Sequence, residues 1–156
     1  MSLAQKIFEL LPGTWRIFRN VPGTGYLCGF AIFEINSGNP GELLYSENGI
    51  FYFDNGKSLE ASKKYTYRLE SEDIYVYDLN CILFHKFGIN EITYDSNDQN
   101  KCFTFNSFHL SGDCEFHIAY DFNFSNNQEF FIIHDVKSTS TDYVSKTRFK
   151  KIKEIL

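Results

Sequence analysis

The sequence predicts an all-β fold: an antiparallel up-and-down barrel of about ten strands with one short N-terminal helix. Aromatic residues make up 18% of the 156 residues, and aromatic side chains favour strands over helices. Short apolar runs follow one another at regular spacing, separated by connections of hairpin length. Such a meander closes most simply into a barrel, which removes the exposed strand edges. A β-sandwich with the same number of strands is the alternative.

The helix is expected over residues 3–11, before the first strand. One helical face carries four apolar residues, Leu3, Ile7, Leu10 and Leu11. Pro12 and Gly13 follow at once, and both residues interrupt helices. The spacing therefore predicts a short amphipathic helix whose apolar face packs against the strands.

Runs of apolar and aromatic residues are expected to form the strands, each bounded by turn-forming residues. In chain order they are 14–21, 26–35, 42–53, 59–69, 74–78, 82–87, 102–110, 115–124, 129–136 and 143–152. Glu47-Asn48-Gly49 interrupts the third run and predicts either a hairpin turn or a bulge there. The polar stretch 95–101 is expected to be a mobile loop.

Charge and composition limit the classes of function. The formal net charge is −5, so no nucleic-acid partner is expected. No run of about eighteen apolar residues occurs, so no membrane span is expected either. The first residues do not follow the pattern of a secretory signal. We therefore expect a cytoplasmic protein that forms a single domain over residues 1–156.

The four cysteines are widely spaced and form no C-x-x-C pair; they are Cys28, Cys81, Cys102 and Cys114. Without a secretory signal they are expected to be reduced thiols that are mostly buried. Two disulfides in a secreted protein are the alternative.

Alternation of side chains along the strands assigns several polar residues to the inside of the barrel. Arg19 shares a strand face with Trp15, and His85 lies on the apolar face of its strand. Tyr65 and Tyr67 likewise share the apolar face of the fourth strand. Buried polar groups are costly unless they find partners, so these residues together predict a polar-lined cavity. The alternative is that each tyrosine hydroxyl reaches the rim and His85 is a core residue with its own partner.

Two histidines and an aspartate, His109, Asp113 and His117, surround a tight turn and contain the residue types of a facial metal triad. Their spacing matches no established metal motif, so no metal is expected. His134 and Asp135 are weaker candidates because neighbours on a strand point to opposite faces. The chain also lacks a P-loop, a dinucleotide-binding glycine motif and a G-x-S-x-G elbow, so no cofactor is expected.

Gly13-Thr14-Trp15, at the start of the first strand, resembles the G-x-W signature of the lipocalin and fatty-acid-binding (calycin) superfamily. A longer pattern, between residues 11 and 151, resembles an uncharacterised family of small lipocalin-like proteins known only as a domain of unknown function. The pattern comprises Gly13-x-Trp15-x-x-x-Arg19, Gly29-x-Ala31-x-Phe33, Leu44-Tyr45-x-Glu47-x-Gly49, Lys64-Tyr65-x-Tyr67, Phe84-His85, His109-Leu110-x-Gly112-Asp113-x-x-Phe116-x-x-x-Tyr120-x-Phe122 and Asp142-Tyr143-x-x-x-Thr147-Arg148.

The superfamily resemblance implies that Trp15 packs at the closed end of the barrel beneath a basic residue from the last strand, for which Arg148 is the candidate. The family resemblance implies an interior lined by histidine, tyrosine, arginine and aspartate, and it brings no established activity. The chain departs from the family pattern over 137–141, where a Gly-Pro-Arg-Lys run is frequent. It departs again at Ser111, where a cysteine is common, which argues against a cysteine-based function.

Alternation and resemblance together predict that the barrel binds a small polar or amphipathic molecule. The residues expected to contact this ligand are Arg19, Tyr65, Tyr67, His85, His109, Asp113 and Tyr120. The alternative is an enzyme on the same barrel, with His85 or His109 as the general acid–base group. Haem binding through a histidine and a purely structural or interaction role are further alternatives. The sequence does not indicate an oligomeric state.

Overall fold

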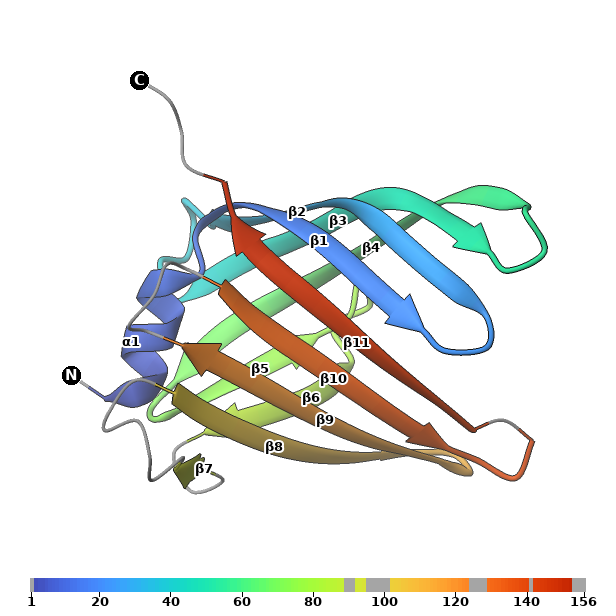
Figure 1. The fold of residues 1–156 in the computed structure, drawn as a ribbon. Coiled ribbons are helices and arrows are strands. Elements are labelled where there is room, and N and C mark those ends of the chain that lie inside the picture. Colours follow the sequence, from blue (N-terminus) through green and yellow to red (C-terminus); the bar gives the residue numbers. More distant parts are fainter. Residues whose placement is uncertain (1, 89–91, 95–101, 124–128, 141, 153–156) are drawn as a thin grey trace.

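The strands follow one another around a nearly closed barrel in the computed structural model of the protein (Figure 1). The structure describes residues 2–88, 92–94, 102–123, 129–140 and 142–152. Paired strands are antiparallel, in the sheet order β6-β5-β4-β3-β2-β1-β11-β10-β9-β8-β7. The pairing of β1 with β11 brings the first and last strands together, so the two edges of the sheet are β6 and β7. The predicted all-β barrel is confirmed.

The described residues form one helix, α1 (Leu3–Leu10), and eleven strands. The strands are β1 (Gly13–Val21), β2 (Gly25–Ile35), β3 (Glu42–Phe53), β4 (Ser58–Glu70), β5 (Asp73–Tyr77), β6 (Leu83–Gly88), β7 (Ile92–Tyr94), β8 (Cys102–Ser111), β9 (Cys114–Asn123), β10 (Glu129–Lys137) and β11 (Asp142–Lys151). All of them except β7 correspond to a predicted run. The sequence does not reveal β7, because three residues are too few to show alternation. The loop expected over 95–101 lies outside the described residues.

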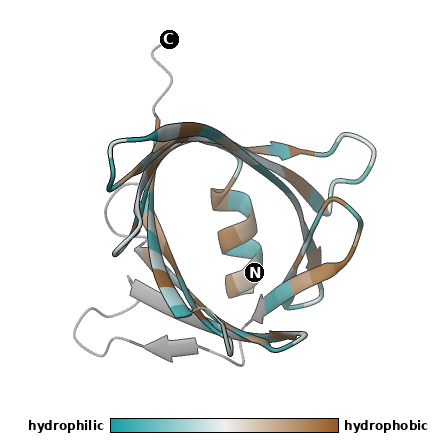
Figure 2. Ribbon diagram, turned by 90° about the vertical axis from the view of Figure 1, so that its right-hand side faces the viewer, coloured by the Kyte–Doolittle hydropathy of each residue, from teal (hydrophilic) through white to brown (hydrophobic). Residues whose placement is uncertain are grey.

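The helix α1 closes one end of the barrel, as the view along the barrel shows (Figure 2). A capping box starts it: the backbone N–H of Gln5 donates to Ser2 Oγ at 3.2 Å, and the backbone N–H of Ser2 donates to Gln5 Oε1 at 2.8 Å. Ile7 and Phe8 are buried against the barrel core. Among the described residues, no helix is long and apolar enough to span a membrane.

Trp15 anchors the core beneath this helix and is fully buried. Its indole Nε1 donates a hydrogen bond to the carbonyl oxygen of Leu11 at 2.8 Å, and its ring packs against that of Phe130 in a T-shaped arrangement. Lys151 Nζ lies over the indole, 5.3 Å from the ring centroid, and donates to the carbonyl oxygen of Leu10 at 2.9 Å. A cation from the last strand therefore covers the tryptophan and holds the end of the helix.

That cation is Lys151, so the expectation that Arg148 covers Trp15 is wrong. Trp15 pairs with Lys151 in the register of β1 and β11, and both side chains point inward. Arg148 lies three residues earlier, on the outer face, where its Nε donates to Glu129 at 2.9 Å. The superfamily pattern indicates the strand that supplies the cation, but only the register identifies the residue.

Replacing Lys151 with alanine should change the tryptophan emission and lower the melting temperature. A cation over an indole contributes about 0.5–2 kcal/mol, and Trp15 is the only tryptophan, so fluorescence reports on this contact alone. Arg148→Ala removes a basic side chain from the outer face of the same strand and should leave the emission unchanged. An emission change in Arg148→Ala with none in Lys151→Ala would show that Arg148, and not Lys151, covers Trp15.

The strand β3 runs without interruption through Glu47-Asn48-Gly49, so neither the predicted turn nor the predicted bulge is present. Gly49 pairs with Gly29 of β2, and the two backbones approach closely there. A Cβ on Gly29 would lie 2.2 Å from the backbone oxygen of Asn48, and one on Gly49 would lie 2.5 Å from that of Cys28. Gly49 therefore permits strand contact rather than a reversal of the chain.

The structure describes the side chains of Cys28, Cys81 and Cys114, and all are free. The expectation that the thiols are mostly buried is wrong for Cys28 and Cys81, which are exposed. Cys28 lies on the outer face of β2 because its neighbour Leu27 points into the barrel. The side chain of Cys102 lies outside the described part of the chain.

Candidate functional site

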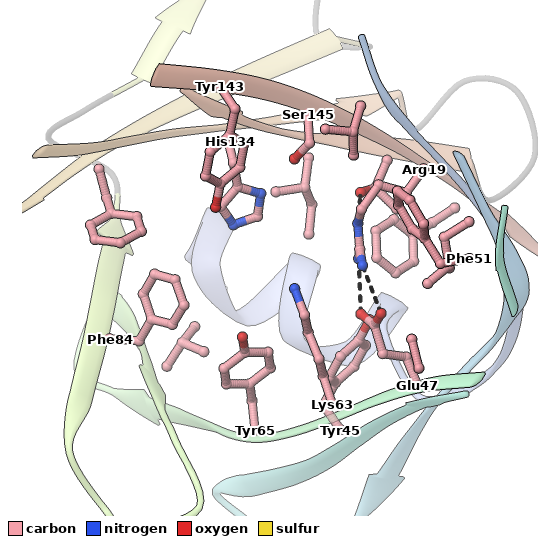
Figure 3. Close-up of a pocket in the computed structure, with 18 of the residues that line it drawn as sticks. Arg19, Tyr45, Glu47, Phe51, Lys63, Tyr65, Phe84, His134, Tyr143 and Ser145 are labelled. Atoms are coloured by element: carbon pink, nitrogen blue, oxygen red, sulfur yellow. Dashed lines mark hydrogen bonds and ion pairs between the residues drawn. The ribbon is translucent and has the colours of Figure 1, made fainter. Parts of the chain in front are cut away.

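A cavity of about 560 Å³ occupies the interior of the barrel beyond the core that packs on α1 (Figure 3). Residues from the ends of strands, among them Val21, Phe53 and Tyr143, contribute to its lining. These strand ends lie opposite α1 in Figure 1. Much of the remaining wall is apolar, formed by side chains that include Leu27, Phe51, Phe84, Phe116 and Ile132. The barrel thus has a closed, packed end and a hollow end.

A buried ion pair joins two strands across one side of this cavity. Arg19 of β1 and Glu47 of β3 meet through two parallel hydrogen bonds, Nη1 to Oε2 at 2.8 Å and Nη2 to Oε1 at 2.9 Å. Arg19 Nε also donates to Thr147 Oγ1 at 2.7 Å, and the Tyr45 hydroxyl donates to Glu47 Oε1 at 2.6 Å. Burial alone would raise the pKa of Glu47, but the hydrogen bonds and charge of Arg19 hold it below its ordinary value.

Lys63 of β4 and His134 of β10 also face the cavity (Figure 3). Lys63 lines the cavity and keeps much of its surface exposed. Its partial burial among the lining side chains and the charge of Arg19 lower the pKa of Lys63. Burial and the positive charges of Lys63 and Arg19 lower the pKa of His134 to about 3, so this imidazole is neutral at neutral pH.

Buried tyrosines and a second histidine form the polar part of the opposite wall. His85 Nε2 contacts the Tyr120 hydroxyl, and a hydrogen bond joins Tyr120 to Tyr67. Burial raises the pKa of both tyrosines and lowers the pKa of His85 well below its ordinary value. Burial also raises the pKa of Tyr65 to about 12. All four groups are therefore uncharged at neutral pH.

The structure brings most of the predicted ligand-contacting residues to this cavity. Those that line it are Arg19, Tyr65, Tyr67, His85 and Tyr120. His109 and Asp113, which were expected with them, are not among the lining residues. His109 packs near Phe84 and Phe116, whereas Asp113 is exposed in the turn after β8 and accepts a hydrogen bond from the Thr139 hydroxyl at 2.7 Å.

The conceivable metal triad does not come together. His117 is half exposed and packs against Phe108 on the outer face of the barrel, away from His109. Asp113 pairs with Thr139 instead of either histidine. Within the described residues, no group of three histidine, cysteine, aspartate or glutamate side chains is placed to hold a metal ion.

Eight polar residues that line the cavity were not among the predicted ligand contacts: Thr24, Tyr45, Glu47, Lys63, His134, Tyr143, Ser145 and Thr147. Lys63 occupies the same strand face as Tyr65, and His134 the same face as Ile132, so alternation contained the signal for both. The Glu-Asn-Gly sequence concealed Glu47, because it is typical of a turn. Once β3 is known to be continuous, Tyr45 and Glu47 both fall on its inward face.

Residues 11–151 match a family of unknown function, DUF6314. The chain belongs to this family. The S-type phycobiliprotein lyase of Guillardia theta has a structure similar to this DUF6314 protein, with a TM-score of 0.64 and 10% sequence identity over 99% of this chain and 95% of that one. A redesigned β-barrel, mFAP1 bound to DFHBI, aligns with a TM-score of 0.41 and 10% identity over 90% of this chain and 94% of that one. No curated protein matches the chain. The similarity to the lyase is one of fold.

Proposed function

We propose that this DUF6314 protein binds a small amphipathic molecule inside its barrel. The observation that carries the proposal is the hollow end of the barrel, about 560 Å³, with apolar walls and a few converging polar groups. Ligand sites commonly have volumes of roughly 300–1,000 Å³ and this mixture of surfaces. The aromatic wall at Phe84 and Phe116 suits an apolar body, and Lys63, His134 and Tyr65 suit a polar group.

The cavity supports binding better than acid–base catalysis. A general acid–base group works best when its pKa lies near the operating pH. Burial lowers the pKa of His134 to about 3, and it lowers that of His85 as well, so neither imidazole exchanges protons readily at neutral pH. His109, the other histidine expected to act in an enzyme, is not part of the lining. These features favour binding over the enzyme alternative.

A cavity-filling variant tests the proposal. The neutral dye Nile red should bind the wild-type protein with increased fluorescence, and Ala61→Trp should weaken that binding at least tenfold. Ala61 lines the cavity opposite Gly49, so a large side chain there occupies ligand volume. Ser62→Trp places the same residue on the outer face of β4 and is the matched control.

Circular dichroism should show that both tryptophan variants keep the β-structure of the wild-type protein. Equal dye affinity in wild-type protein and Ala61→Trp would contradict binding in this cavity. So would a loss of affinity in Ser62→Trp alone.

A further inference from the structure

The charged groups that line the cavity do not balance. Arg19, Lys63 and Glu47 are the described lining residues whose side chains ordinarily carry a charge at neutral pH. The lowered pKa values of His85 and His134 leave both histidines neutral, and the raised values of the lining tyrosines Tyr45, Tyr65, Tyr67 and Tyr120 leave them protonated. Two cations therefore face one carboxylate, and a protonated Lys63 gives the cavity a net positive charge.

Internal contacts already occupy Arg19 and Glu47. Each of the three side-chain nitrogens of Arg19 donates a hydrogen bond, two to Glu47 and one to Thr147. Both carboxylate oxygens of Glu47 accept from Arg19, and one also accepts from the Tyr45 hydroxyl. Arg19 was expected to contact the ligand, but its donors serve to hold β1, β3 and β11 together.

Lys63 is the cation that remains available. Within the described residues it forms no hydrogen bond and no ion pair. Glu47, the carboxylate nearby, is paired with Arg19 instead. The Lys63 side chain extends from β4 toward the middle of the cavity, between Tyr65 and the Arg19–Glu47 pair, and faces His134 across the space (Figure 3). An ammonium group that faces a cavity with largely apolar walls, and has no hydrogen-bond or ion-pair partner, favours a bound anion, because opposite charges attract more strongly there than in bulk water.

We infer that the ligand of this cavity carries an acidic group and that Lys63 binds that group, a step that rests on the proposed function. The ligand class is an organic anion with an apolar body: a carboxylate, sulfonate or similar head at Lys63 and a chain or ring system along Phe84 and Phe116. An ammonium group recognises the charge of such a head without requiring the planar, two-point geometry that Arg19 provides to Glu47.

Three matched ligands separate charge recognition from apolar binding. Decanoate, decanesulfonate and decanol share one apolar chain and differ in the head group. In competition with Nile red at pH 7.5, both anions should bind the wild-type protein at least tenfold more tightly than decanol. Lys63→Met keeps a side chain of similar length without the charge. In this variant the affinity for the two anions should fall to within about twofold of the affinity for decanol. Lys63→Gln is a second neutral variant if the methionine variant does not fold.

The control is Lys64→Met, which removes a charge from the outward face of the same strand and should keep the full preference for anions. Equal affinity for decanoate and decanol in the wild-type protein would overturn the inference and leave the proposed function intact. A preference that survives Lys63→Met would overturn the assignment to Lys63. Failure of all three ligands and of Nile red to bind would overturn the proposed function itself.

Discussion

Replacing Glu47 with leucine should lower the free energy of unfolding by about 3–5 kcal/mol, because the change leaves the Arg19 guanidinium buried without its partner. The side chains of Arg19 and Glu47 are 12% and 3% exposed, so water replaces little of the lost interaction. Equilibrium unfolding in urea, followed by circular dichroism, measures the effect. Removing both charges with Arg19→Met and Glu47→Leu should restore most of the loss, since no buried charge is then unpaired.

The outer face of the barrel provides the matched control for this prediction. Arg148 and Glu129 form the same kind of ion pair, with the arginine half exposed to solvent. Glu129→Ala should cost about 0–1 kcal/mol, as is usual for pairs in water. A loss for Glu47→Leu no larger than that for Glu129→Ala would show that the buried pair does not stabilise the barrel.

Local patterns were sufficient to predict the fold. The apolar face of residues 3–11 and the Pro-Gly pair that follows determine the helix, and it forms over Leu3–Leu10. Strand positions follow from alternation and from turn residues, which are properties of neighbours in the sequence. Gly49 is an exception: a turn-like sequence lies within a strand there because Gly29, remote in sequence, passes close to it.

The site was predicted only in part, because pairing between distant strands decides its chemistry. Alternation correctly predicted that Arg19 points inward, but the sequence does not show that it pairs with Glu47. Lys151 could not be distinguished from Arg148 as the cation over Trp15 without the register of β1 and β11. Asp113 shares a motif with cavity residues, yet its position in a turn takes it to the surface. Residue type and spacing therefore identify candidates, and register determines which of them meet.

Lowering the pH from 7 to 5 should destabilise the barrel by about 2–4 kcal/mol through His85 and His134. Burial lowers the pKa of both histidines in the folded protein, that of His134 to about 3, whereas the unfolded chain has the ordinary value near 6.5. Below pH 6.5 the unfolded state binds more protons than the folded state, so the free energy of unfolding falls as the pH falls. Each histidine contributes at most about 2 kcal/mol over this interval, at about 1.36 kcal/mol per pH unit.

The carboxylates affect stability mainly at lower pH. The folded-state pKa values of Glu42 and Glu47 are lowered from 4.5, so the stability that they contribute is lost chiefly below that pH. Urea unfolding at pH 7 and pH 5 therefore isolates the histidines. His134→Phe should remove about half of the difference, because phenylalanine fills the same space and cannot be protonated. His117→Gln, on the outer face, controls for the removal of a histidine. Equal unfolding free energies for the wild-type protein at the two pH values would show that neither imidazole is held neutral by the barrel.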